Sequence, residues 1–314
     1  MDIVVVVEVM IKLLAVMILG FFLSRIDVLD REVSKKLSWM VVNVTSPLLV
    51  IYSVFEVTVQ DRSIVWNTLL IGICCYLSFI LAAFVLSRLL RIPRGSRGIF
   101  QFMLVFANTG FMGYPVLQSL FGTEAIFYAS IYGIPFNLLV YTYGVSIIRN
   151  DRVGTDTPQE REKFRWKSLI NVGTISSVVA IVLFLTAFPL PDVVVEFCGM
   201  VGNTTTPLSM LIIGASLADV SIREMIRDKK LYVLAALRLF AIPFLMYAAC
   251  TLLHIDSYIT GIATVSAAMP AASMAVMMAK SYDGNTDFAS KGVVFTTLLC
   301  VATLPVVVYV THLI

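Results

Sequence analysis

The sequence FANTGFMGYP, residues 106–115, interrupts an apolar segment that extends over residues 98–120. It contains an asparagine, a threonine, two glycines and a proline. Proline removes a helical hydrogen bond and glycine loosens the backbone, so this composition is costly in a helix that faces lipid. Peptide groups without partners persist at membrane depth only inside protein or beside a water-filled cavity. The stretch therefore predicts a broken transmembrane helix next to a substrate site.

A milder version of this break, SAAMPAAS at residues 266–273, lies in the apolar segment 257–280. If the two breaks cross near the membrane midplane, each half-helix N-terminus exposes peptide N–H groups and about half a positive charge. The expected ligand is an anionic group, above all a carboxylate, with neutral hydrogen bonds from Asn108, Thr109 and Ser273. The alternative is a pair of proline kinks that neighbouring helices satisfy.

The composition places the chain in a membrane. Of the 314 residues, 59% are hydrophobic and 14% charged, and the mean hydropathy is +0.92. Soluble domains are about 45–50% apolar and about 25% charged. The excess apolar surface requires a lipid bilayer as solvent. The net charge of +3 does not indicate a nucleic-acid partner, because the basic residues are sorted by membrane side.

Ten apolar stretches are long enough to cross the hydrocarbon core. They cover residues 3–23, 36–55, 64–87, 98–120, 124–147, 168–188, 193–218, 231–252, 257–280 and 289–311. The loops on one side of the membrane hold 20 of the 23 lysines and arginines, counting Lys36 at the edge of the first loop. The loops on the other side hold only Arg62. This positive-inside asymmetry predicts ten helices with both termini outside, in a bacterial cytoplasmic (inner) membrane.

An internal repeat divides the chain. The motif N-x-T-[ST]-P-L occurs at 43–48 and again at 203–208, each time in the second helix of its half. We therefore expect a first five-helix unit at 1–148, a cytoplasmic linker at 149–167 and a second unit at 168–314. Because five is odd, the second unit enters the membrane from the opposite face, as in many secondary transporters.

Several of these motifs resemble those of the auxin efflux carrier family, which includes plant auxin carriers and bacterial malate and malonate permeases. The likeness rests on N-T-x-x-M-G-x-P at 108–115, A-M-P at 268–270, A-K-x-Y at 279–282 and the segment around 206–218. The resemblance implies a fold similar to the sodium–bile acid symporters and sodium–proton antiporters, with broken fourth and ninth helices. It also implies a homodimer and an elevator movement, with a scaffold of 3–23, 36–55, 168–188 and 193–218 and a transport domain of 64–147 and 231–311.

The resemblance also implies which residues line the substrate site. They are Asn108, Thr109, Gly110, Pro115, Asn137, Pro270, Ala271, Ser273, Asn43, Thr45, Asn203 and Thr205. Ala271 stands where plant carriers have a polar glutamine, which favours an organic acid smaller than auxin.

Charged residues within the predicted helices have open roles. Glu8 and Lys12, four residues apart, form a self-neutralising pair, or else a proton site and a substrate counter-ion. Arg238 either extends to the membrane surface or contacts the moving domain. No metal centre or cofactor is expected beyond a coupling ion. H⁺ is one candidate, and Na⁺ would be held near Thr45, Thr109 and Ser266.

The sequence thus predicts a secondary transporter of small organic anions rather than an enzyme. The alternative within transport is a cation–proton antiporter of similar fold, although neither break contains Asp or Glu. More remote alternatives are an intramembrane hydrolase and a membrane receptor.

Overall fold

The computed structural model describes residues 3–57, 63–151, 171–218, 225 and 227–311, and the predicted linker therefore lies mostly outside the described residues. Helices are the only regular secondary structure among the described residues, apart from one isolated bridge between Ala107 and Ala271. Six helical stretches are long and apolar enough to cross a membrane, which confirms an all-helical, multi-pass membrane protein. They are Val7–Arg25, Arg31–Glu56, Ser63–Leu89, Glu124–Arg149, Lys229–Leu252 and Thr286–Val310.

Some of these stretches are one helix and others are composite. The single helices are α1 (Ile3–Arg25), α4 (Ser63–Leu89) and α18 (Thr286–Val310). The composite stretches are α2 (Arg31–Met40), η1 (Val41–Thr45), α3 (Ser46–Ser53) and η2 (Val54–Glu56); α7 (Glu124–Tyr132), α8 (Ile134–Leu139), η4 (Val140–Gly144) and α9 (Val145–Arg149); and α14 (Lys229–Ala236), η6 (Leu237–Ala241) and α15 (Ile242–Leu252).

Shorter helices occupy the other four predicted segments. They are α5 (Arg97–Val105), η3 (Thr109–Gly113) and α6 (Tyr114–Phe121); α10 (Val172–Thr186); α11 (Asp192–Gly202) and α12 (Thr205–Leu217); and α16 (Ser257–Ala268) and α17 (Met274–Ser281). The interruptions at 106–108 and 269–273 fall inside the two predicted breaks. A third, after Gly202, was not predicted. It has a local cause, because Pro207 has no N–H to donate to the carbonyl of Asn203.

Prolines also explain three wide helical turns. The π-helical segments η1, η3 and η6 each end two residues before a proline, at Pro47, Pro115 and Pro243. A proline ring displaces the carbonyl four residues earlier, and a wide turn absorbs the displacement. Such turns occur frequently at functional sites. Candidate residues from the sequence lie in all three of these turns.

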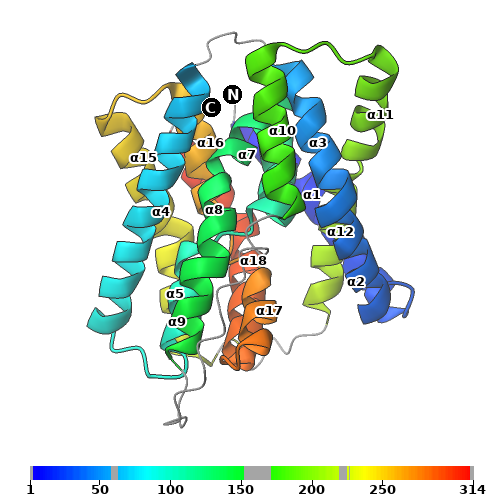
Figure 1. The fold of residues 1–314 in the computed structure, drawn as a ribbon. Helices are drawn as coiled ribbons and strands as arrows, with labels where there is room; N and C mark the ends of the chain where they lie inside the picture. The colour runs from blue at the N-terminus through cyan, green and yellow to red at the C-terminus, as the bar shows by residue number, and fades with distance from the viewer. Residues whose placement is uncertain (1–2, 58–62, 152–170, 219–224, 226, 312–314) are drawn as a thin grey trace.

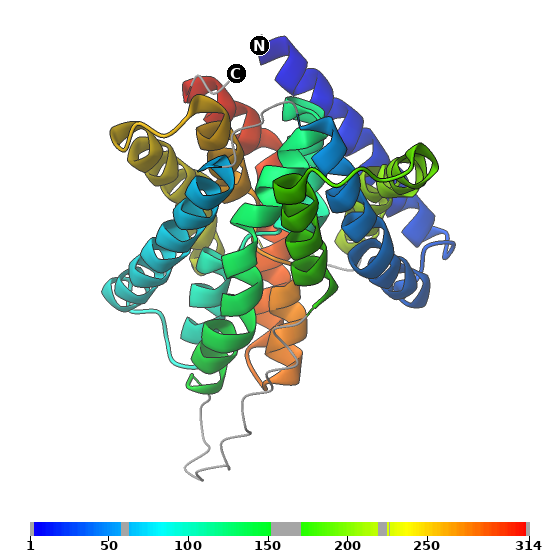
Figure 2. The same ribbon diagram turned by 45° about the horizontal axis from the view of Figure 1, so that its top comes forward.

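The chain ends lie together at one end of the molecule, and α2, α5, α9 and α17 approach the opposite end (Figures 1 and 2). Along one flank, α1 packs against α12 through two glycines. A Cβ added at Gly20 would collide with the carbonyl of Leu211, and one added at Gly214 would collide with the carbonyl of Met17. Small residues allow this close approach of two helix backbones.

We expect Gly214→Val to destabilise the protein, because the new side chain forces α1 and α12 apart. The cost of overpacking is about 1–3 kcal/mol, measured as a lower midpoint of thermal unfolding in detergent. Gly110→Ala is the control, because no atom lies within 4 Å of a Cβ built there. Equal midpoints for both variants would contradict the tight α1–α12 contact.

Candidate functional site

The two breaks in the predicted fourth and ninth segments meet and run antiparallel. The N–H of Asn108 donates to the carbonyl of Pro270 at 2.8 Å, and the N–H of Ala272 donates to the carbonyl of Phe106 at 2.9 Å. Ala107 and Ala271 form the bridge between these bonds. Each break therefore supplies the backbone partners that the other lacks, which a pair of separate proline kinks would not do.

Beyond the crossing, each of the two segments starts a new half-helix, η3 with α6 in one and α17 in the other. The carbonyl of Asn108 accepts the N–H groups of Met112 and Gly113, at 3.2 and 3.0 Å, in the first turn of η3. Ser273 is exposed at the start of α17. Asn108 is only 5% exposed, yet among the described residues its side-chain amide has no hydrogen-bond partner. An amide at a helix N-terminus that makes no hydrogen bond within the protein is free to bind a ligand.

Arg238 caps the two half-helices, α5 and α16, that lead into the crossing. Its Nε donates to the carbonyl of Met269 at 3.1 Å, and its Nη1 donates to the carbonyl of Leu104 at 2.9 Å. These carbonyls lie at the C-terminal ends of α16 and α5, where the helix dipoles place partial negative charge. Arg238 is fully buried, so the prediction that it extends to the membrane surface is wrong.

The repeat motifs contact one another and the first broken helix. The hydroxyl of Thr205 donates to the hydroxyl of Thr45 at 2.9 Å, and these residues occupy equivalent positions 160 apart. The Gln118 amide in α6 donates to the Asn203 side chain at 2.7 Å and accepts from the Thr206 hydroxyl at 2.9 Å.

Other predicted site residues have structural roles. The Asn43 amide donates to the carbonyl of Trp39 in its own helix at 2.9 Å. Asn137 lies beside Gly173 at the start of α10 rather than at a described part of the crossing. Ala271 is buried, and its N–H donates to the Thr296 hydroxyl at 3.1 Å. Pro115 is buried at the start of α6.

The predicted ion pair of α1 is present, and it lies on the surface. Lys12 Nζ is 2.7 Å from a Glu8 carboxylate oxygen, and the side chains are 69% and 60% exposed. The structure therefore supports the self-neutralising pair and places neither residue in the crossing.

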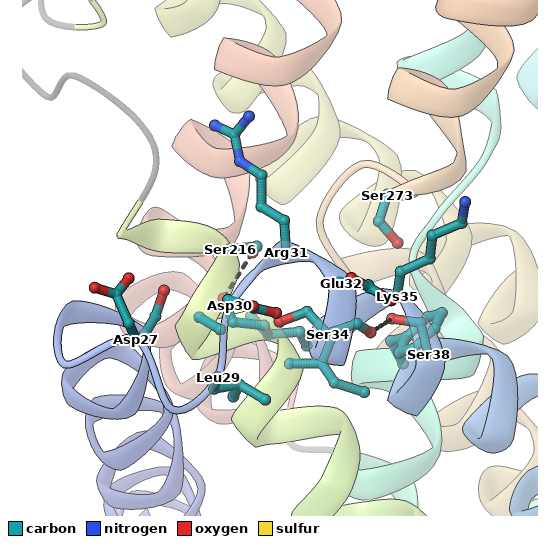
Figure 3. A pocket seen from close by; sticks show the side chains of 15 residues that line it. Asp27, Leu29, Asp30, Arg31, Glu32, Ser34, Lys35, Ser38, Ser216 and Ser273 are labelled. Carbon is teal, nitrogen blue, oxygen red and sulfur yellow. Dashed lines mark hydrogen bonds between the residues drawn. The ribbon is translucent and has the colours of Figure 1, made fainter.

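A cavity of about 830 Å³ reaches the crossing from the end of the molecule opposite the chain ends (Figures 1 and 3). Its lining includes Ser273 and Phe111 from the half-helices, and Ser34 and Ser38 from α2. Asp27, Asp30, Arg31, Glu32 and Lys35 bring charges of both signs to its rim. Asp30 caps α2, and Glu32 pairs with Lys36 at 2.8 Å. Figure 3 shows Ser273 on the far wall from Asp27.

The described residues offer no resident metal site, because no group of three or more His, Cys, Asp or Glu side chains is close enough to hold an ion. The cavity and the crossing instead combine peptide N–H groups, hydroxyls and one buried amide. This set of groups suits an organic ligand better than a bound metal.

Residues 5–308 match the family model described as membrane transport protein. The chain belongs to this family. The match confirms the resemblance to auxin efflux carriers and identifies a member of a membrane transporter family. An uncharacterized transporter of Methanothermobacter thermautotrophicus is 24% identical, over 95% of this chain and 96% of its own length. The uncharacterized transporter MJ1031 of Methanocaldococcus jannaschii is 21% identical, over 92% and 94%.

Sequence reasoning missed Gln118, Thr206 and Thr296 as members of the site. Gln118 was detectable as a polar residue in an otherwise apolar half-helix. Thr296 had no such signal, because a threonine in a helix commonly bonds only to its own preceding turn. Its second bond, to Ala271, depends on tertiary structure.

Arg238→Met should reduce both stability and transport. The substitution leaves the buried carbonyls of Leu104 and Met269 without a donor, at about 1–3 kcal/mol each. Arg238→Lys keeps the charge but can donate to only part of this pair of carbonyls. Its unfolding midpoint and its uptake should therefore lie between those of the wild type and Arg238→Met. Thermal unfolding in detergent and uptake into vesicles measure the effects. The control is Arg88→Met, which removes an exposed charge. An unfolding midpoint of Arg238→Met equal to that of Arg88→Met would exclude the capping role.

Proposed function

We propose that this protein is a secondary transporter of small organic anions, carboxylates such as malate, malonate or auxin-like acids. The observation that carries the proposal is the Asn108 amide at the crossing of two half-helices, which makes no hydrogen bond within the described chain although the residue is only 5% exposed. Ser273 and the open space around Gly110 lie at the same N-termini. Peptide N–H groups, an amide and a hydroxyl together suit a carboxylate.

The charges around the crossing favour an anion. Arg238 offsets the partial negative charge of two helix C-termini, which is about half a unit each. No Asp or Glu within 106–115 or 266–273 offsets the partial positive charge of the two N-termini. The partial positive charge of the half-helix N-termini is therefore not offset by any carboxylate of these two segments. A cation–proton antiporter, the alternative, needs a carboxylate where this protein has Asn108 and Ser273.

The architecture we propose has ten spans in two inverted units of five. The Thr45–Thr205 bond supports it, because equivalent residues of two repeats contact each other only near the axis that relates the repeats. In this scheme the α1–α12 pair belongs to the scaffold, and the broken helices belong to a transport domain that moves as an elevator. The cavity at the end of the molecule where the basic loops lie then makes this an inward-facing state.

The remaining parts of the proposal rest on the family resemblance and the charge pattern. They are a cytoplasmic membrane location with both termini outside, assembly as a homodimer, and coupling to Na⁺, to H⁺ or to no ion. The Na⁺ site would use Thr45, Thr109 and Ser266. Thr45 already accepts the Thr205 hydroxyl, and Ser266 is buried in α16.

Counterflow in proteoliposomes tests the function. Vesicles loaded with one unlabelled carboxylate should take up the same labelled compound, with a panel of mono- and dicarboxylates assayed in parallel. Imposed Na⁺ and pH gradients identify the coupling ion. If no carboxylate moves while Na⁺ or K⁺ exchanges for H⁺, the antiporter alternative is correct.

Asn108→Ala should lower counterflow by about tenfold or more, because a hydrogen bond to a charged ligand is lost. The thermal unfolding midpoint should stay unchanged, since the described structure gives that side chain no bond to lose. Asn150→Ala is the matched control, because its amide bonds only to Ser146 on the exposed end of α9. Wild-type counterflow by Asn108→Ala would remove the crossing from substrate binding.

A further inference from the structure

The two half-helices that begin at the crossing, α6 and α17, differ in how much of their surface other helices cover. On one side, α6 packs against α1 and α12, and Gln118 uses both ends of its amide to hold Asn203 and Thr206. These bonds join a broken helix to the repeat motif of the other half.

On the other side, α17 packs mainly against α18, α5 and α9. Its remaining face is uncovered and consists of Ser273, Met277 and Lys280, at helical spacings of four and three residues. Met277 is 53% exposed, whereas its neighbour Met278 is 3% exposed and packs inward. Of these three residues Ser273 lines the cavity, so the face begins at the open space beside α2.

The repeat identifies the surface opposite this face. Asn203 and Thr206, which Gln118 holds, are equivalent to Asn43 and Ser46 by the same shift of 160 residues. Gln118 comes eight residues after Gly110, and Lys280 comes seven residues after Ser273. These spacings place Gln118 and Lys280 about two turns into their half-helices, on the face that starts at the crossing.

We infer that α6 and α17 contact the repeat motifs alternately. In the present state the hydrogen bonds of Gln118 to Asn203 and Thr206 hold α6 in place, and we call these bonds the latch. In the other state the Ser273–Met277–Lys280 face of α17 seats on the Asn43–Ser46 turn. This inference rests on the proposed alternating access and adds which surfaces meet. The movement closes the cavity, covers Met277, brings the Lys280 ammonium to the side-chain oxygens of the turn and releases Gln118.

Pairs of cysteines in a background without the five native cysteines test both contacts in membranes. Gln118→Cys with Thr206→Cys should cross-link readily, because those side chains already touch. Lys280→Cys with Ser46→Cys should cross-link slowly, through the second state. The control pair is Met278→Cys with Ser46→Cys, which places the thiol on the packed face of α17 and should not cross-link.

Adding Gln118→Leu to the Lys280–Ser46 pair should raise its rate of cross-linking about fivefold or more, since two hydrogen bonds of the present state are lost. Ser119→Leu, at the exposed neighbouring position, should leave the rate unchanged. Gln118→Ala repeats the test without an added apolar side chain, and elution from size-exclusion chromatography verifies folding of each variant.

A Lys280–Ser46 rate no higher than that of the Met278 control, or unaffected by Gln118→Leu and Gln118→Ala, overturns the inference. Cross-linking needs no substrate, so its result is independent of counterflow. A chain that cross-links as expected but moves no carboxylate retains the latch and loses the proposed function. A protein that moves carboxylates but does not form the Lys280–Ser46 cross-link retains the proposed function and loses the latch.

Discussion

At membrane depth, every peptide group needs a partner within the protein, and the crossing of the two broken helices depends on this constraint. Asn108 and Ala272 donate to Pro270 and Phe106, so each interruption supplies backbone partners to the other. One break alone would leave unpaired groups in hydrocarbon. The breaks are therefore a single structural unit, although 164 residues separate Ala107 from Ala271 along the chain. Helices α4, α7, α15 and α18 provide the packed surroundings in which irregular backbone is tolerated.

The same arrangement determines the electrostatics of the site. Four half-helix ends meet, and their dipoles would largely cancel if nothing else were present. Arg238 changes this balance because its guanidinium bonds to Leu104 and Met269 on the C-terminal side. A buried arginine is costly unless its charge is offset, and here the carbonyl ends of two helices contribute to that. What remains uncompensated is the N-terminal side, next to Asn108 and Ser273. One residue thus satisfies carbonyls on one side of the crossing, while the peptide N–H groups on the other side keep their partial positive charge.

The sequence predicted this fold through local signals. Apolar length placed the helices within a few residues, and proline placed both breaks correctly, with two glycines beside it in the first. The i, i+4 spacing of Glu8 and Lys12 predicted a pair that the structure confirms. The signals failed where a contact joins distant segments. Nothing near Arg238 shows that its partners are Leu104, 134 residues away, and Met269. Gln118 likewise acquires its role only when α6 meets the turn at Asn203. The amide of Asn43, a strong candidate by motif, bonds instead within its own helix, a choice that only the backbone geometry decides.

The chemistry of the contacts separates a fixed interface from one that can move. Between α1 and α12, Gly20 and Gly214 bring two backbones together, and no water can replace that packing without a cavity. Between α6 and α12, the amide of Gln118 contacts an amide and a hydroxyl, and water can substitute for each bond at little enthalpic cost. Sliding across the first interface would lose close packing at every step, whereas sliding across the second exchanges one set of hydrogen bonds for another. In the elevator movement that we propose, the glycine contacts belong to the scaffold and the exchangeable polar contacts lie where the transport domain slides.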